Sequence, residues 1–284
     1  MPQRSVRHVA LVTGGSRGIG EAICRRVARE GATVLVAARS LERCTKVAES
    51  IRAAGGTAWP LALDVADPHS IEAALDEARR VLASAKNAGR LAARSECRID
   101  WLVNNAGIAE SAPLGDEKRE ARMERQFAVN FHGARRLMEA LLPDMESRGY
   151  GRIVNVASSA GLRGYAYVTA YCASKFALVG YSLAVADELD GTGVGVNLVC
   201  PHYVDSPLLK ESVQRLVKKT SMEESMAREF FRRSNPGERL VTMEEVAEAT
   251  VQLLHGVENG AVLELDGSSE LKLRHPNRSS GVAS

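Results

Sequence analysis

The alternation of short apolar runs with longer helical patterns is the feature that most constrains the fold of this 284-residue chain. Continuous apolar runs are typical of strands buried on both faces of a parallel sheet. The segments between them repeat apolar residues at helical spacing, which predicts crossover helices. Right-handed crossovers then give an α/β fold, a single-domain doubly wound Rossmann sheet of seven parallel strands with helices on both faces. The predicted strands are residues 9–12, 34–38, 58–63, 101–103, 153–156, 194–199 and 262–265.

Composition excludes several functional classes. The chain has 37 Lys and Arg against 35 Asp and Glu, and this near balance gives no basic field for nucleic acid. No apolar run approaches the roughly 20 residues that span a bilayer. The five cysteines lie far apart and form no CxxC pair, which is typical of reduced thiols and predicts no metal site. We therefore expect a cytoplasmic protein without a membrane span.

A glycine-rich segment, TGGSRGIG at residues 13–20, follows the first predicted strand and opens the first helix. Glycine permits a tight turn and a close approach of backbone to phosphate, and the free N–H groups of a helix start bind a pyrophosphate. This position in the chain favours a dinucleotide-binding loop. The alternative is a strand-to-helix turn with surplus glycine.

The end of the second strand distinguishes NADP from NAD. An NAD site usually places Asp or Glu about 20 residues after the glycines, where it binds the ribose 2′-hydroxyl. This chain has Arg39 at that point and no acid, and Arg17 lies within the glycine loop. Two guanidinium groups can bind a 2′-phosphate through charge-assisted hydrogen bonds, so the sequence predicts NADP(H). Either arginine alone is equally consistent with a solvated surface residue.

Tyr171 and Lys175 are four residues apart and therefore share one face of a predicted helix. A cation close to a phenol favours the phenolate, so we expect Lys175 to lower the pKa of Tyr171 from its ordinary value near 10. Such a tyrosine can act in acid–base chemistry at neutral pH. An isolated YxxxK string is more often a pair on a helix surface.

Taken in order and spacing, these motifs resemble the compact form of the short-chain dehydrogenase/reductase family. The resemblance covers residues 7–268 and rests on the glycine loop together with Asp64-Val65, NNAG at 104–107, Asn130, Ser158 and YCASK at 171–175. It implies an NADP(H)-dependent oxidoreductase that interconverts a secondary alcohol and a ketone. The alternatives are a non-catalytic NADP-binding regulatory protein and a lyase or epimerase acting on a nucleotide sugar.

The resemblance also implies roles for a catalytic tetrad. Tyr171 is the general acid/base, and Lys175 lowers its pKa and holds the nicotinamide ribose. Ser158 binds the substrate oxygen, whereas its neighbour Ser159 lines the pocket. Asn130 holds a water that links Lys175 to solvent.

A cofactor-binding set is implied in the same way. Asp64 and Val65 lie against the adenine, Asn105 lies on the adenosine side, and Val204 meets the nicotinamide carboxamide through its backbone. The full set is Gly14, Ser16, Arg17, Ile19, Gly20, Arg39, Asp64, Val65, Asn105, Tyr171, Lys175 and Val204.

One departure from the family pattern follows the sixth strand. The family usually has Gly after the proline, and this chain has His202 there. The imidazole could narrow the site, contact substrate or point to solvent. Ser206 stands where the family has a threonine, whose hydroxyl it can replace.

The remaining segments are assigned by composition. Residues 206–239 carry two amphipathic patterns and predict a lid of two short helices. Its apolar residues, with Leu162, Tyr165 and Tyr167, suggest a bulky carbonyl substrate, unless they are simply the core of the lid. Residues 84–98 predict a helix extension and surface loop, and residues 269–284 a polar tail after the catalytic domain of residues 1–268. By resemblance, the chain forms homodimers or homotetramers.

Overall fold

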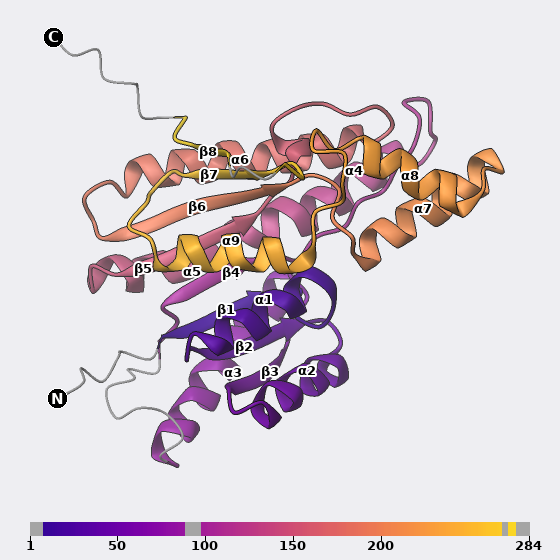
Figure 1. Ribbon diagram of the computed structural model, residues 1–284. Coiled ribbons are helices and arrows are strands. Elements are labelled where there is room, and N and C mark those ends of the chain that lie inside the picture. The colour runs from indigo at the N-terminus through magenta and orange to yellow at the C-terminus, as the bar shows by residue number, and fades with distance from the viewer. Residues whose placement is uncertain (1–7, 89–97, 269–271, 277–284) are drawn as a thin grey trace, which may run out of the picture.

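A computed structural model describes residues 8–88, 98–268 and 272–276, and these form one α/β sandwich around a single sheet (Figure 1). The sheet has eight strands in the order β3-β2-β1-β4-β5-β6-β7-β8. The first seven are parallel, as the continuous apolar runs predict. They are β1 (Val9–Thr13), β2 (Thr33–Ala38), β3 (Thr57–Ala62), β4 (Trp101–Asn104), β5 (Gly151–Val156), β6 (Val194–Pro201) and β7 (Val262–Leu265).

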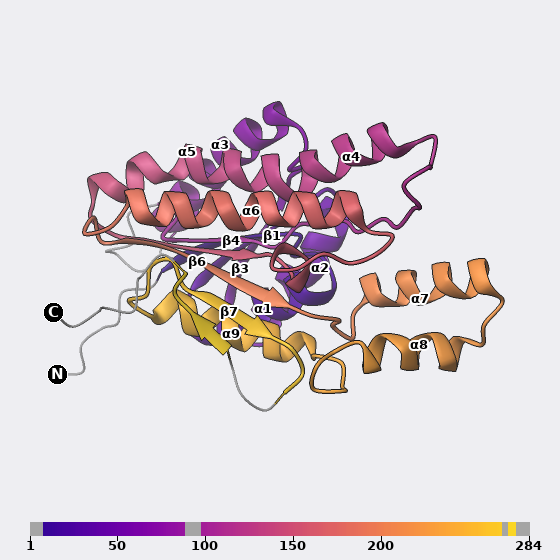
Figure 2. The ribbon, with the colours of Figure 1, turned by 90° about the horizontal axis from the view of Figure 1, so that it is seen from above.

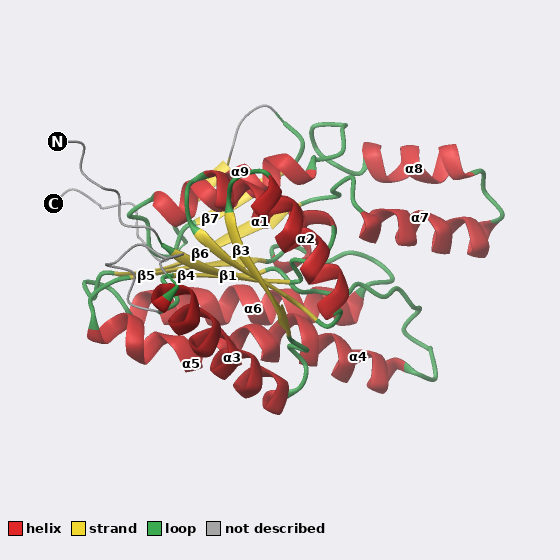
Figure 3. Ribbon diagram, turned by 90° about the horizontal axis from the view of Figure 1, so that it is seen from below, coloured by secondary structure: helices red, strands yellow, loops and turns green. Residues whose placement is uncertain are grey.

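Helices cover both faces of the sheet, as a doubly wound fold requires (Figures 2 and 3). One face carries α1 (Gly18–Arg29), α2 (Leu41–Ala53) and α9 (Met243–His255). The other face carries α3 (Pro68–Asn87), α5 (Gly133–Ser147) and α6 (Thr169–Glu188). Each layer encloses its own apolar core, and these cores hold the carboxyl ends of the strands in fixed positions. A further helix, α4 (Arg119–Phe127), leads into α5 through a π-helical turn at Ala128–His132.

The eighth strand corrects the prediction of seven strands followed by a polar tail. β8 (Lys272–Arg274) pairs antiparallel with β7 and forms one edge of the sheet. Lys272 binds Asp266 at 2.5 Å, and Arg274 binds Glu264 at 2.8 Å. A charged segment read as a solvated tail is therefore an edge strand, a position where charged side chains are common. Residues 277–284 lie outside the described part of the chain.

The segment predicted to be a lid contains two helices, α7 (Pro207–Thr220) and α8 (Glu224–Arg233), which project beyond the sheet (Figure 2). They enclose a small apolar core of Leu209, Val213, Ala227 and Phe231. These side chains therefore fill the lid itself, which is the alternative interpretation of its apolar pattern. The predicted extension of α3 reaches Asn87, and residues 89–97 of the expected surface loop lie outside the described residues.

None of the helices within the described ranges has the length and apolarity needed to cross a membrane.

Candidate active site

The candidate site lies at the carboxyl ends of the strands, where the strand order reverses between β1 and β4 (Figure 1). Ligands of open α/β sheets bind in the crevice at this switch point. The glycine loop follows β1, the NNAG segment follows β4, and Ser158 follows β5. Helix α6 brings Tyr171 and Lys175 to the same edge, so the sheet topology brings together the motif at residues 13–20 and the motif at residues 171–175.

The glycine loop has the shape of a phosphate-binding turn. Gly14 has φ +66°, and a Cβ there would lie 2.9 Å from Nδ2 of Asn105. A Cβ at Gly20 would lie 2.2 Å from the carbonyl oxygen of Gly14, so the helix can approach the loop this closely only with glycine. No side chain caps the first turn of α1. Its N–H groups are therefore left for a ligand, which fits the pyrophosphate of a dinucleotide.

Asn105 fixes the glycine loop to the end of β4. Its side-chain Nδ2 donates to the Thr13 carbonyl oxygen at 3.0 Å, and its backbone N–H donates to the Thr13 hydroxyl at 3.0 Å. Asn105, which is expected on the adenosine side, thus also fixes the conformation of the glycine loop. Ser16 and Ile19 lie on the same turn, with Ile19 packed against the apolar core below.

Both predicted phosphate-binding arginines are exposed, and they differ in their surroundings. Arg39 makes no hydrogen bond or ion pair with any described residue, so its guanidinium is free for a ligand. Arg17 pairs with Glu211 of α7 at 3.2 Å. Sequence reasoning missed this contact, because nothing in the local pattern connects residues 194 positions apart.

Asp64 and Val65 follow the end of β3, beside the crevice. The Asp64 carboxylate accepts a hydrogen bond from the Ala66 N–H at 3.0 Å, which fixes the turn. Val65 is buried. A Cβ added to Gly133 would lie 2.7 Å from the Cβ of Val65, so only glycine fits beside Val65 at this position. On the opposite side of the crevice Val204 is buried in a short parallel bridge with Val241.

Ser158, Tyr171 and Lys175 lie together in the crevice. Lys175 is 4% exposed, and its Nζ donates to the Val156 carbonyl oxygen at 3.0 Å. The same Nζ lies 5.9 Å from the centre of the Tyr171 ring. The Ser158 hydroxyl accepts from the Ala160 N–H at 3.1 Å, which orients it at the end of β5.

The pKa values of the pair differ from the expectation for Tyr171. Burial raises the pKa of Tyr171 to about 12, although the neighbouring Ser158 hydroxyl opposes this by favouring the phenolate. Burial also lowers the pKa of Lys175 to about 8. The expected lowering of the Tyr171 pKa is therefore not found in the protein by itself, because desolvation of the phenol is the largest influence on that pKa. Both groups are nonetheless perturbed by the same buried environment, as catalytic groups commonly are.

Asn130 is the central residue of the π-helical turn between α4 and α5. It is 1% exposed, its Oδ1 accepts from the Ile108 N–H at 2.9 Å, and its Nδ2 donates to the Ser174 hydroxyl at 3.0 Å. These bonds tie the segment after β4 to α6. A Cβ on Gly107 would lie within 3.7 Å of both Asn130 Oδ1 and Lys175 Nζ, so the two side chains are neighbours. Single π-turns of this kind are frequent at functional sites.

Three nearby residues make contacts that the sequence did not predict. The Ser159 hydroxyl is 2.8 Å from the Tyr165 hydroxyl, so it bonds to the loop before α6. The Ser206 hydroxyl caps α7 by accepting from the Leu209 N–H. The His202 side chain is 1% exposed and bonds to Glu264, so it points into the protein and not to solvent.

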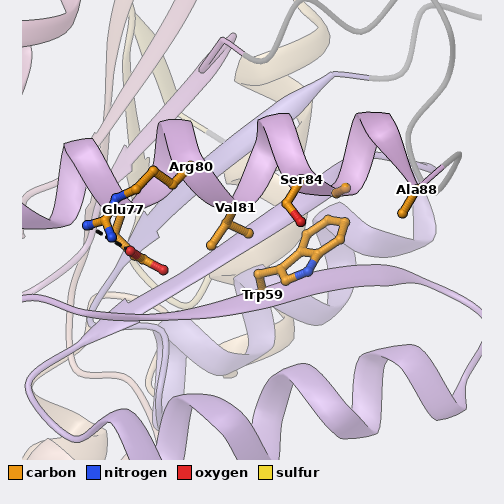
Figure 4. A pocket seen from close by; sticks show the side chains of 7 residues that line it. Trp59, Glu77, Arg80, Val81, Ser84 and Ala88 are labelled. Carbon is orange, nitrogen blue, oxygen red and sulfur yellow. Dashed lines mark ion pairs between the residues drawn. The ribbon is translucent and has the colours of Figure 1, made fainter.

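A separate pocket of about 330 Å³ lies against the second half of α3 and Trp59 of β3 (Figure 4). Because β3 is parallel to the other strands, this half of α3 lies toward their amino ends, away from the crevice. Its charged residues, Glu77 and Arg80, neutralise each other in an ion pair of 2.9 Å. We assign it no part in the site. Over the described ranges, no cluster of His, Cys, Asp and Glu has the makeup of a metal site.

Comparison with known proteins agrees with this geometry. The family model for short chain dehydrogenases matches residues 8–216, and the chain belongs to this family of oxidoreductases. A ketoacyl reductase, HetN, of Nostoc is 37% identical to this chain. The match covers 68% of this chain and 62% of that protein. An uncharacterized oxidoreductase, YxjF, of Bacillus subtilis is 34% identical over 92% of this chain and 97% of its own length.

Solved structures are similar over nearly the whole chain. A variant of actinorhodin polyketide ketoreductase, solved with NADPH, has a TM-score of 0.81 and 31% identity, and the match covers 92% of this chain and 96% of that one. L-Sorbose reductase from Gluconobacter frateurii, solved with NADPH and L-sorbose, has a TM-score of 0.79 and 26% identity, with 94% and 98% covered.

Proposed function

We propose that the protein is an NADP(H)-dependent ketoreductase that interconverts a ketone and a secondary alcohol. The observation that carries this proposal is the grouping of Ser158, Tyr171 and Lys175 beside the glycine loop, with Arg17 in that loop and Arg39 directly after β2. The relatives named ketoacyl reductase and polyketide ketoreductase, one of them solved with NADPH, support the same reaction class.

In the reaction, bound NADPH supplies a hydride to the carbonyl carbon, and the protein supplies the proton. Tyr171 donates this proton to the carbonyl oxygen, and Ser158 holds that oxygen by a hydrogen bond. A phenol with a pKa of about 12 is fully protonated at neutral pH and is therefore ready to act as an acid. Lys175 then stabilises the phenolate that remains, because its ammonium is charged below pH 8.

Cofactor binding is divided among the residues around the crevice. We propose that Gly14, Ser16, Ile19 and Gly20 hold the pyrophosphate against the start of α1, and that Arg17 and Arg39 bind the 2′-phosphate. Asp64, Val65 and Asn105 enclose the adenosine. At the other end, Val204 and the Tyr171–Lys175 pair hold the nicotinamide riboside, and Asn130 holds a water beside Lys175.

The substrate is proposed to be a medium-sized or bulky ketone, such as a β-ketoacyl thioester or a polyketide-like ketone. Leu209, Val213 and Phe231 pack within the helix pair α7–α8, so this assignment rests on the relatives and on Tyr165 and Tyr167 before α6. We propose further that the protein is cytoplasmic and acts as a homodimer or homotetramer. Light scattering on the purified protein tests the assembly.

The direct test of the proposed function is NADPH oxidation with a panel of ketones, followed by absorbance and by chromatography of the alcohol. We expect turnover with NADPH and alcohol formed in equal amount. A non-catalytic NADP-binding regulatory protein would instead bind NADPH and leave it unoxidised with every ketone.

The rate of reduction is expected to fall as the pH rises through about 8. Lys175 loses its charge there, and the phenolate left on Tyr171 loses its stabilising cation. Tyr171 does not contribute to the decline, since its pKa of about 12 keeps it protonated throughout. The measurement is kcat for ketone reduction from pH 6 to 10 at saturating NADPH. Lys175→Arg stays charged and should remove the decline, whatever its absolute rate; a rate that rises from pH 7 to 9 in the native protein contradicts the assignment.

Glu211→Gln is expected to tighten NADPH binding by about 1.5- to 5-fold, the range of an exposed ion pair worth roughly 0.2–1 kcal/mol. In the protein alone the Glu211 carboxylate occupies Arg17, and it competes with the 2′-phosphate for the same guanidinium. NADH lacks that phosphate, so its affinity should stay unchanged. Fluorescence titration of both nucleotides measures the effect, and Glu224→Gln on α8 is the control. Equal gains for NADPH and NADH would show that Arg17 does not bind the phosphate.

A further inference from the structure

The side chain of His202 is buried beside the segment that leaves β6. It is 1% exposed, and its Nε2 lies 2.9 Å from Oε1 of Glu264 on β7. A carboxylate only accepts hydrogen bonds, so Nε2 carries the proton of the imidazole. The backbone N–H of His202 donates to the Leu265 carbonyl oxygen at 2.8 Å. Both the backbone and the side chain of this residue are therefore fixed to β7.

Glu264 connects His202 to the edge strand. Its second carboxylate oxygen accepts from Arg274 of β8 at 2.8 Å, and its side chain is 12% exposed. One carboxylate thus bridges a buried imidazole and a guanidinium, using both of its oxygens. Because Arg274 lies on β8, the bridge ends in a strand beyond the part of the chain that the family model matches.

At the His202 end, the backbone on both sides of this residue leads to the candidate site. Pro201, next to His202, accepts a hydrogen bond at 3.5 Å from the Ser158 hydroxyl through its carbonyl oxygen. Tyr203, on the other side, is held by Asn235, whose Oδ1 accepts from the Tyr203 N–H at 2.9 Å. Val204 follows directly. The segment 201–204 therefore contacts Ser158 at its first residue and carries the residue assigned to the nicotinamide, Val204, at its last.

We propose that His202, Glu264 and Arg274 are positioning residues, and that through them β8 holds the segment 201–204 in register with Ser158 and the nicotinamide. The proposal rests on the proposed function for its effect on rate. None of the three side chains contacts Tyr171 or Lys175 in the described structure, so they act through the backbone of the segment. Displacements of about 1 Å at a reacting centre can cost on the order of 10²-fold in rate.

The chain offers a matched control on the same strand. Lys272 also anchors β8, through an ion pair of 2.5 Å with Asp266, whose carboxylate otherwise accepts from Ser268 and is not the carboxylate that binds His202. Loss of either cation weakens the attachment of β8. Only loss of Arg274 removes a partner of the Glu264 carboxylate that binds His202. The two variants therefore distinguish an effect on overall stability from an effect on the position of the segment 201–204.

The test compares Arg274→Ala, Arg274→Lys and Lys272→Ala by kcat, by ketone KM, by NADPH affinity and by Tm. We expect Arg274→Ala to lower kcat about tenfold, equivalent to about 1.4 kcal/mol, with NADPH affinity nearly unchanged. Arg274→Lys should restore most of the rate. Lys272→Ala should retain the native kcat even if it lowers the Tm as much as Arg274→Ala does. Equal loss of kcat in Arg274→Ala and Lys272→Ala, or no loss in either, overturns the proposal.

A double-mutant cycle adds a readout of coupling. If the three residues act as one unit, adding His202→Gln to Arg274→Ala should cost clearly less than the sum of the two single effects on kcat. Additive effects would show that His202 and Arg274 act separately, which contradicts the bridge.

Hydrogen exchange makes the test independent of turnover. The backbone N–H of His202 donates to the carbonyl oxygen of Leu265, and that of Asp205 donates to the carbonyl oxygen of Val241. In peptides covering 201–206, Arg274→Ala should increase exchange and Lys272→Ala should not. If the native protein reduced no ketone, the proposed function would fail, yet this exchange pattern would still support the network. Unchanged exchange in Arg274→Ala overturns the network whatever the activity.

Discussion

Tyr171→Phe is expected to lower kcat for ketone reduction by roughly 10²- to 10⁴-fold, the usual contribution of a positioned general acid. The substitution removes only the hydroxyl, and with it the proton that the carbonyl oxygen needs. The ring remains, so the packing of α6 and the contact with Lys175 are kept. NADPH affinity should therefore be nearly unchanged. Single-turnover kinetics with NADPH and a ketone measure the loss without interference from product release.

Tyr181→Phe is the matched control for this variant. It removes a hydroxyl from the same helix, where the phenol bonds to Glu139 at 3.0 Å, away from the crevice. This control should keep the native rate. If Tyr171→Phe retained more than about a tenth of kcat, a loss smaller than general acid catalysis normally supplies, the proton donor would have to be another group.

Arg17→Ala combined with Arg39→Ala is expected to weaken NADPH binding by on the order of 10²-fold or more. Each guanidinium can form charged hydrogen bonds with the 2′-phosphate, and such bonds are worth about 1.5–3 kcal/mol apiece. Arg39 has no competing partner among the described residues, whereas Arg17 must first leave Glu211. We therefore expect the larger single effect from Arg39→Ala. NADH binding should change little, so the ratio of the affinities for NADPH and NADH should fall by the same factor as the NADPH affinity.

Arg29→Ala is the control for removal of a positive charge. Arg29 is also exposed and ends α1, at the opposite end of the helix from the glycine loop. Titration with NADPH and NADH at two salt concentrations separates contact from general attraction, because surface electrostatics are screened by salt. An equal loss of affinity for both nucleotides would contradict the assignment of the two arginines.

The sheet could be predicted because its strands carry a local signal. The seven parallel strands are mainly apolar, and all except the edge strand β3 are almost fully buried between the two helix layers. β8 could not be recognised in this way. It is an exposed edge strand with charged residues, and what fixes it is a pair of contacts to Glu264 and Asp266. Such contacts depend on the tertiary fold and leave no periodic pattern in the sequence.

The candidate site shows the same division. The family resemblance was enough to expect Ser158, Tyr171 and Lys175 in one crevice, and the structure brings them there. The direction of the tyrosine pKa was wrong, because the sequence gives the neighbouring cation but not the extent of burial. The buried orientation of His202 was not among the expected outcomes, since its partner lies 62 residues further along the chain.

The central claim is that this crevice transfers hydride from NADPH and a proton from Tyr171 to a ketone. It is tested most directly by the initial rates of NADPH and NADH oxidation with a β-ketoacyl thioester, a cyclic ketone and a keto sugar. The account predicts that NADPH is oxidised with at least one of them, that alcohol forms in equal amount, and that Tyr171→Phe abolishes the rate. Saturable NADPH binding with no oxidation by any of the three ketones would contradict it.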